Sequence, residues 1–186
     1  MQVKAIAVFC GSKSGVNPIF VDHAEQLGAL LASKEINLIY GGGNKGLMGA
    51  VANGALSKGG KVTGIIPKAL TEFEHQHEGL TELNIVDTMH IRKQLLYDKC
   101  DAAIILPGGY GTLDEVFEML TWNQLSIHHR PIYFMNSGGF YNHLLAHIQM
   151  MEAEGLLYGK PTDLITVVDE VTAFEELLSG PNETAD

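Results

Sequence analysis

The segment LPGGYGTLDEVFE, residues 106–118, combines three glycines with closely following carboxylates. A glycine-rich turn that leads into a helix presents backbone N–H groups to a bound anion, and the helix dipole favours negative charge there. Asp114 and Glu115 follow almost at once, so an acid would lie beside the anion. The two features are compatible if the ligand is a phosphosugar, with its phosphate at the amides and its sugar at the acid.

The same acids also have a purely structural interpretation. Thr112 and Glu115 have the spacing of a capping box, in which Thr112 caps the helix and Glu115 reaches back to the cap residue. Acids in a first helical turn also interact favourably with the helix dipole. This segment alone leaves both interpretations open.

A second glycine-rich turn, GGGNKG, follows an earlier apolar run. Gly41, Gly43 and Gly46 spell GxGxxG, but no acid follows about 20 residues on, where a dinucleotide-binding fold places its ribose partner. Neither turn contains GxxxxGK[ST], so the pattern argues against a nucleoside triphosphatase and an ordinary NAD dehydrogenase. Tight-turn geometry would explain one such turn. Two turns at one sheet edge favour a composite site for a monophosphate or similar anion.

Two adjacent cations, Arg92 and Lys93, stand near the start of a predicted helix. Cations are unfavourable there because of the helix dipole, and an anion at the sheet edge would supply a reason for them. The alternative is a solvated basic pair. His75 and His77 fit a solvated loop better than a metal cluster, since no matching ligand pair accompanies them.

Composition excludes several classes of protein. The chain has 186 residues, 46% hydrophobic and 18% charged, which suits a globular domain. A net charge of −10 with 12 Lys+Arg argues against nucleic-acid binding. No signal-peptide pattern or membrane-length apolar run is apparent, so we expect a cytoplasmic protein that does not bind membranes. Cys10 and Cys100 are expected to be buried thiols.

The elements that must position these residues follow from alternating apolar runs and helical repeats. Nearly continuous Val, Ile, Leu and Ala runs predict strands buried on both faces, and helices between them predict a parallel sheet. The expected fold is a Rossmann-like, doubly wound α/β sheet of about seven strands in three αβα layers, with one domain over 1–179 and a flexible tail over 180–186. The predicted strands are Val3–Phe9, Ile36–Tyr40, Val62–Ile66, Leu83–Val86, Ala102–Leu106, Ile132–Phe134 and Leu164–Val168. The first predicted helix begins at Asn17-Pro18. The further predicted helices cover Leu47–Lys58, Met89–Lys99, Thr112–Leu125, Tyr141–Glu154 and Val171–Leu178.

Taken together, these segments resemble one family. PGGYGTLDE matches its PGGxGTxxE motif, and GGGNKGLMGAVA, MHIRK, PKALTEFE and LTWNQL match further segments in the same order. The chain thus resembles the lonely-guy (LOG) family of cytokinin-activating nucleotide hydrolases from Ile6 to about Leu157. The resemblance implies a homodimer that cleaves the N-glycosidic bond of a nucleoside 5′-monophosphate to a free base and ribose 5-phosphate. The base would be adenine or an N6-substituted adenine.

The resemblance also implies roles for individual residues. Arg92 and Glu115 would be catalytic, and no metal or organic cofactor would be required. A carboxylate beside C1′ suits the oxocarbenium-like transition state of glycoside cleavage. The residues that would line the nucleotide site are Glu74, Lys93, Gly109, Tyr110, Gly111, Thr112, Leu113, Asp114 and Thr121, with additional loop contacts from Gly42, Gly43 and Met89.

Two other functions compete with this one. A non-catalytic carrier of a nucleotide or cofactor could use the same fold, since glycine turns bind without reacting. The pairing of Arg92 with Glu115 favours the enzyme, because a carrier needs no acid beside the sugar. An amino-acid decarboxylase is disfavoured, because pyridoxal phosphate requires a Schiff-base lysine with supporting partners and the chain shows no such set.

Overall fold

Seven parallel strands form one sheet in the order β4-β3-β2-β1-β5-β6-β7. The structure is a computed structural model and describes residues 3–71 and 75–179. The central strands are almost completely buried, which explains their uninterrupted apolar sequences. The strands are β1 (Ala5–Phe9), β2 (Asn37–Tyr40), β3 (Val62–Pro67), β4 (Glu82–Val86), β5 (Ala102–Ile105), β6 (Ile132–Met135) and β7 (Ile165–Val168).

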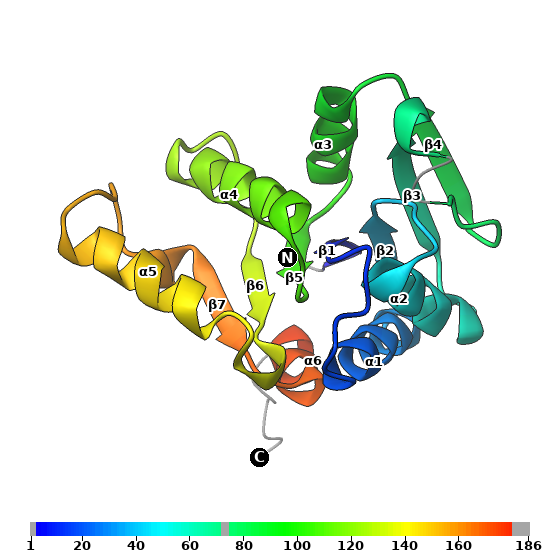
Figure 1. The fold of residues 1–186 in the computed structure, drawn as a ribbon, viewed down its shortest axis with the longest axis horizontal. Coiled ribbons are helices and arrows are strands. Elements are labelled where there is room, and N and C mark those ends of the chain that lie inside the picture. The colour runs from blue at the N-terminus through cyan, green and yellow to red at the C-terminus, as the bar shows by residue number, and fades with distance from the viewer. Residues whose placement is uncertain (1–2, 72–74, 180–186) are drawn as a thin grey trace, which may run out of the picture.

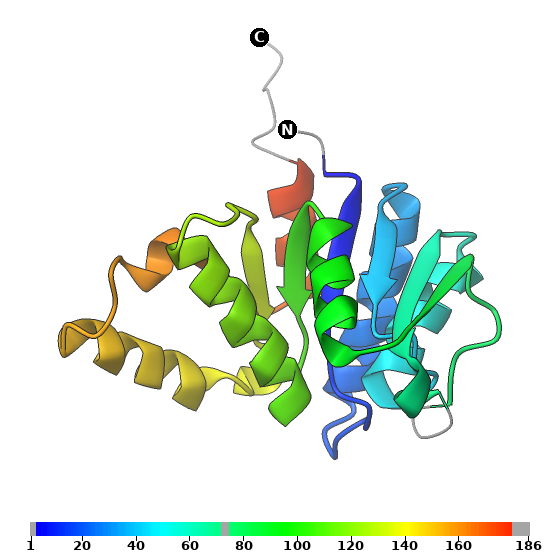
Figure 2. The same cartoon turned by 90° about the horizontal axis from the view of Figure 1, so that it is seen from above.

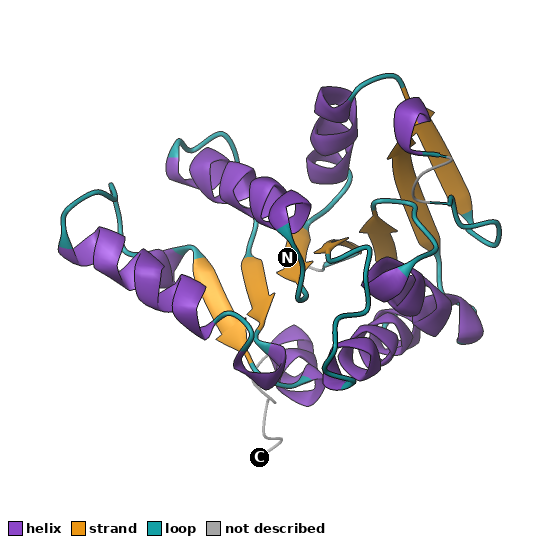
Figure 3. Cartoon of the chain, in the orientation of Figure 1, coloured by secondary structure: helices purple, strands orange, loops and turns teal. Residues whose placement is uncertain are grey.

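Helices cover both faces of the sheet and give three layers (Figure 1). One apolar cluster joins one face of the sheet to α1, α2 and α6, and a second joins the opposite face to α3, α4 and α5. Figure 3 shows the strands between these two sets of helices. The helices are α1 (Ile19–Ser33), α2 (Gly46–Ser57), α3 (Met89–Asp98), α4 (Tyr110–Gln124), α5 (Asn142–Ala153) and α6 (Val171–Ser179).

The predicted fold class is confirmed, and each predicted strand and helix has a counterpart within a few residues. The helix α1 begins at Ile19 with Pro18 in the N-cap position, and Asn17 Oδ1 accepts a hydrogen bond of 3.2 Å from the Ile19 amide. The predicted tail, 180–186, and Glu74 lie outside the described residues. No helix in the described part of the chain is both long and apolar enough to cross a bilayer.

The capping-box interpretation of Thr112 and Glu115 is wrong. The helix α4 begins at Tyr110, two residues earlier than predicted, and Gly109 occupies the N-cap position with an extended backbone. Thr112 therefore lies inside the first turn, where its side chain packs against Gly108 so closely that any Cβ at residue 108 would overlap it. Glu115 lies in the second turn, too far along to reach back to the cap.

Candidate active site

The sheet reverses its winding between β1 and β5. The chain leaves β1 toward the α1 face and leaves β5 toward the α4 face, so the two loops diverge from neighbouring strands. Figure 2 shows the strand arrows pointing to this edge, where the loop after β1 lies beside the start of α4. Ligands of open α/β sheets bind at such a reversal.

Two adjoining cavities of about 330 and 320 Å³ lie at this reversal, and they share Gly11, Ser12 and Gly109. The first cavity is the cleft that holds Arg92 and Glu115, and we call it the acid cleft. The second has an apolar wall formed by Phe20, Leu47, Pro107 and Phe140. The acid cleft is lined by Cys10, Gly11, Ser12, Met48, Met89, Arg92, Gly109, Tyr110, Gly111, Thr112, Asp114 and Glu115.

The N-terminus of α4 is open toward ligand. The first amides of a helix have no partner within it, and the part of the chain that the structure describes supplies no other acceptor for those of Tyr110, Gly111 and Thr112. A Cβ added at Gly109 or Gly111 would meet nothing within 4 Å, so the space beside this backbone is unoccupied by protein. This geometry suits a phosphate.

The glycine-rich turn GGGNKG, which precedes α2, is arranged differently. The α2 amides of Leu47 and Met48 both point to the Gly11 carbonyl, at 3.1 and 3.4 Å, so the loop after β1 occupies the position that an anion would take. Gly46 has a φ of 57°, and a Cβ there would overlap the backbone of Ser12 and Lys13. The first amides of α2 are therefore occupied by protein, and the turn before α2 supports the loop after β1.

Gly42 and Gly43 are held by the segment that follows β3. Gly42 has a φ of 80°, and its carbonyl accepts a 3.0 Å hydrogen bond from the His77 amide. Gly43 forms an isolated antiparallel bridge with Gln76. Neither glycine lines either of the two cavities.

His77 lies in the segment 75–79, which we call the latch because it holds Gly42 and Gly43. The prediction that His77 lies in a solvated loop is therefore wrong. Its side chain is buried, Nδ1 accepts from the Gly79 amide at 3.0 Å, and Nε2 lies 3.1 Å from Asn53 Oδ1 on α2. Since Nδ1 accepts, Nε2 carries the proton and donates to Asn53. Burial lowers the pKa of His77, and the nearby Glu78 only partly opposes this shift. The neutral ring therefore ties the 75–79 segment to α2. The burial of His77 could not be predicted, because a single histidine in a polar segment gives no sequence pattern that indicates burial.

Arg92 and Glu115 come together in the acid cleft although they lie on different helices. Their side chains are 7% and 12% exposed, and Arg92 Nη2 lies 3.9 Å from Glu115 Oε1. That distance is an ion pair but too long for a hydrogen bond. Arg92 Nη1 contacts Met89 Sδ at 3.9 Å, and Nε has no hydrogen-bond partner among the described residues. A buried guanidinium with so few strong acceptors is suited to receive an anionic or oxygen-rich ligand.

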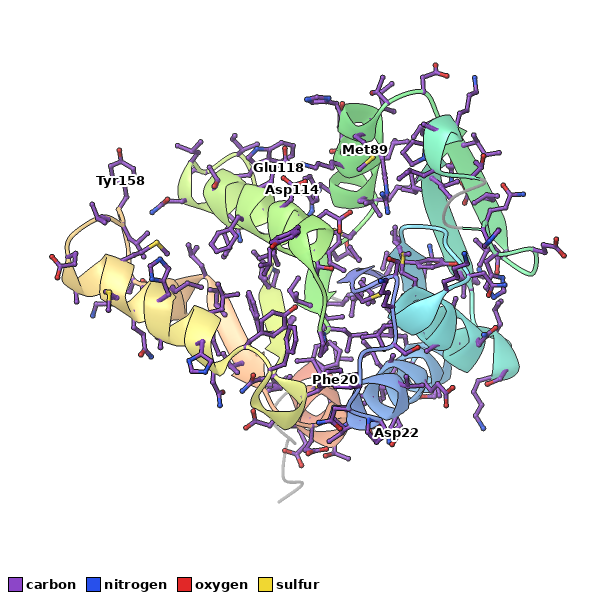
Figure 4. All side chains as sticks on the ribbon, in the orientation of Figure 1. Phe20, Asp22, Met89, Asp114, Glu118 and Tyr158 are labelled. Atoms are coloured by element: carbon purple, nitrogen blue, oxygen red, sulfur yellow. The ribbon has the colours of Figure 1, made fainter. Side chains whose placement is uncertain are left out.

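Lys93 does not line the acid cleft. Its Nζ lies 2.8 Å from Asp114 Oδ2 and 3.1 Å from Glu118 Oε2, both on α4. Figure 4 places Asp114 and Glu118 on the side of α4 that faces α3. Burial by itself lowers the pKa of Lys93, but the hydrogen bonds to Asp114 and Glu118 outweigh it and leave the pKa raised. The solvated-pair explanation is therefore wrong for Lys93, whose charge is balanced by Asp114 and Glu118 on α4.

Apart from Gly42, Gly43 and Glu74, the predicted site residues divide between two places. Arg92, Met89, Asp114, Glu115 and the 109–112 backbone line the acid cleft. A neighbouring hollow of about 410 Å³ on the outer side of α4 is lined by Lys93, Leu113, Asp114, Phe117, Glu118, Thr121 and Trp122. Asp114 alone lines both. The Thr121 hydroxyl donates to the Phe117 carbonyl at 2.7 Å.

Sequence reasoning missed the loop after β1. Cys10, Gly11 and Ser12 line the acid cleft, as does Met48 from α2. A signal was available, because the sequence CGSKSG follows the first predicted strand and loops at the carboxyl ends of parallel strands form binding sites. Within the described residues, no group of three or more His, Cys, Asp or Glu side chains is arranged to hold a metal ion.

The sequence of the chain matches a family model and is similar to known proteins over most of its length. Residues 48–178 match the family model described as possible lysine decarboxylase. The chain is 43% identical to a cytokinin riboside 5′-monophosphate phosphoribohydrolase of Rhodococcoides fascians, over 96% of this chain and 90% of that protein. It is 46% identical to a protein of the same name from Arabidopsis thaliana, over 84% of this chain and 72% of that protein.

Solved structures show a likeness of fold. The molybdenum cofactor carrier protein of Chlamydomonas reinhardtii superposes with a TM-score of 0.73 over 96% of this chain and 97% of that chain, at 17% identity. The molybdenum cofactor binding protein of Rippkaea orientalis gives a TM-score of 0.71 over 96% and 97%, at 23% identity.

Proposed function

This chain belongs to the lonely-guy family of cytokinin riboside 5′-monophosphate phosphoribohydrolases, and from that premise we propose that it hydrolyses the N-glycosidic bond of a nucleoside 5′-monophosphate. The substrates in this proposal are cytokinin riboside 5′-monophosphates, AMP or both. The products are the free base and ribose 5-phosphate. The observation that carries the proposal is the buried Arg92–Glu115 pair beside the open N-terminus of α4.

In this proposal the phosphate binds at the amides of residues 109–112. These amides point into unoccupied space, and the positive end of the α4 dipole adds to the attraction. Glu115 lies one helical turn further along, so a ribose bound through its phosphate would reach the carboxylate. The acid and the anion site serve opposite ends of one phosphosugar.

The chemistry requires that water adds to C1′ while the bond from C1′ to the base nitrogen breaks. The electron pair leaves with the base, which gains a proton, and positive charge develops on the sugar. The Glu115 carboxylate would stabilise that charge, orient the ribose hydroxyls or accept the proton of water. Arg92 lies 3.9 Å from Glu115, which favours a role at the leaving base over one at the phosphate.

The other predicted residues have separate places in this proposal. Tyr110, Gly111 and Thr112 belong to the phosphate site, and Met89 would contact the nucleotide beside Arg92. Lys93, Leu113 and Thr121 would act at the outer rim, in the hollow that Asp114 connects to the acid cleft. Glu74 is proposed as a nucleotide contact from the family resemblance alone.

We also propose a cytoplasmic homodimer. Two apolar side chains exposed just after α4, Leu125 at 60% and Ile127 at 62%, support an interface on that layer. Both cysteines are buried as thiols, which suits a reducing compartment.

The test is incubation of the protein with AMP and with isopentenyladenosine 5′-monophosphate, following the free base. We expect base release from at least one of them. Tight binding of both nucleotides without release of base would overturn the proposal and support the carrier alternative.

The variant Glu115→Gln should fold normally and lower turnover about 100-fold or more, because it removes a charged group that acts in the transition state. Glu154→Gln, at an exposed acid beyond α5, is the matched control and should be fully active. Full activity of Glu115→Gln would reduce Glu115 to a structural residue.

A further inference from the structure

The separation of Arg92 from Glu115 depends on how α3 is placed against α4. Each residue comes from one of these helices, and their contact of 3.9 Å is too long to set the distance itself. An ion pair of this kind contributes little unless other groups hold its partners. Another interaction between the two helices must therefore determine the geometry of the acid cleft.

Tyr97 on α3 provides that interaction. Its side chain is fully buried, and its hydroxyl lies 2.9 Å from the Glu115 carbonyl oxygen and 3.0 Å from Glu118 Oε2. The Glu115 carbonyl belongs to the same residue whose carboxylate faces Arg92, so this hydrogen bond acts directly on the backbone that carries the acid. The single hydroxyl proton is shared between the two acceptors.

Packing of the Tyr97 ring against the sheet and α4 holds its hydroxyl in position. The Tyr97 ring packs edge-on against Phe9 of β1 at 6.0 Å and against Trp122 of α4 at 4.8 Å. Phe9 ends the strand that leads into the loop after β1, which also lines the acid cleft. Tyr97 thus connects the central strand, α3 and the Glu115 turn of α4.

Glu118 extends the same contact to Lys93. Its carboxylate lies 3.0 Å from the Tyr97 hydroxyl and 3.1 Å from Lys93 Nζ, and Lys93 also reaches Asp114 at 2.8 Å. Two residues of α3, Tyr97 and Lys93, therefore meet three residues of α4 beside Arg92. Burial, followed by the charge of Glu118, raises the pKa of Tyr97, so its hydroxyl keeps the proton that it donates.

We infer that Tyr97, supported by Glu118, is a positioning residue that holds the Glu115 carboxylate opposite Arg92 for the reaction. This inference rests on the proposed hydrolysis. Neither residue lines the acid cleft, so neither acts on the nucleotide directly. Their effect passes through the backbone of Glu115.

The test compares Tyr97→Phe with wild type in the base-release assay. The ring and its packing remain and only the hydroxyl is lost, so the fold should survive. We expect kcat to fall about tenfold while KM changes less than about twofold, since misplacing a catalytic group slows the reacting step more than binding. Tyr133→Phe, at a half-buried tyrosine of β6, is the matched control and should keep the wild-type kcat.

A double-mutant cycle with Glu115→Gln separates positioning from general stability. If Tyr97 acts through Glu115, then Tyr97→Phe should cost almost nothing further in the Glu115→Gln background. Equal losses in both backgrounds, or an unchanged kcat in the single variant, would overturn the inference. Glu118→Gln is the second variant if Tyr97→Phe does not fold, and it should lower kcat in the same direction. Failure of the wild type to release any base would instead contradict the proposed function.

Discussion

At the scale of single residues, the site is defined by a buried cation whose donors are largely unused. Arg92 reaches Glu115 only at 3.9 Å, and its Nε has no hydrogen-bond partner in the described chain. Burying a charge without strong partners is costly, so such an arrangement is expected where a ligand completes the interactions. The glycine at 41 makes this possible, because a Cβ there would overlap the Arg92 guanidinium.

Gly41→Ala should therefore lower activity more than stability. The new methyl group would push the guanidinium and contact Met48 Sδ, both of which are ends of flexible side chains that can move. We expect kcat/KM for base release to fall about tenfold or more, as for a misplaced catalytic group, with little change in the thermal midpoint.

Gly159→Ala is the matched control, because a Cβ at that position meets nothing within 4 Å and its backbone is unstrained. It should leave both activity and stability unchanged. Wild-type activity of Gly41→Ala would show that the Arg92 position is not critical.

At the scale of elements, two similar glycine-rich turns have different tasks. The turn before α4 leaves its helix amides open, whereas the turn before α2 has its amides occupied by the Gly11 carbonyl. The turn before α2 is also held by the 75–79 segment, through the Gly43–Gln76 bridge and the hydrogen bond from His77 to Asn53. The first amides of α4 are open, whereas those of α2 support the loop after β1, although both turns follow a buried strand and precede a helix.

The His77 latch predicts a pH dependence of stability. The folded protein holds the ring neutral with its pKa lowered, whereas the unfolded chain takes up a proton near the ordinary value of 6.5. Below that pH the unfolded state binds more protons, so the contribution of His77 is fully present above about pH 6.5 and is lost as the pH falls.

His77→Gln should flatten the slope of unfolding free energy between about pH 7.5 and 5.5, measured by denaturant titration at each pH. His143→Gln, at an exposed position of α5, is the control and should keep the wild-type slope. An unchanged slope in His77→Gln would contradict the latch.

At the scale of the whole molecule, the strand order determines where the site lies. Strands β1 to β4 extend to one side and β5 to β7 to the other, so the loops after β1 and β5 separate and leave the acid cleft and its apolar neighbour between them. The presence of this reversal follows from connecting parallel strands with helices on both faces.

The proposed homodimer is a prediction at this scale. Size-exclusion chromatography with light scattering should give twice the chain mass of 20.2 kDa. Replacing exposed Leu125 with Asp should shift the mass toward that of one chain, because a charge would be buried in the interface on the α4 layer. A single-chain mass for the wild type would contradict the homodimer.

The sequence by itself determined the local features of this protein. Buried apolar runs such as Ala102–Ile105 and helical repeats report on the burial of each segment, and the PGGYGTLDE motif marks the turn into α4. These properties depend on neighbouring residues, so the fold class and the placement of Arg92 and Glu115 near a sheet-edge site could be predicted, whereas their catalytic roles were implied by the family resemblance.

Only the tertiary structure decided how distant segments meet. It showed that Gly11 occupies the amides of α2, that Lys93 is neutralised by α4, and that Tyr97 holds the backbone of Glu115. It also placed the start of α4 at Tyr110, two residues before the predicted start, with Thr112 packed against Gly108. Such contacts join residues far apart in the chain or depend on side-chain packing, and no local pattern of residue types encodes them.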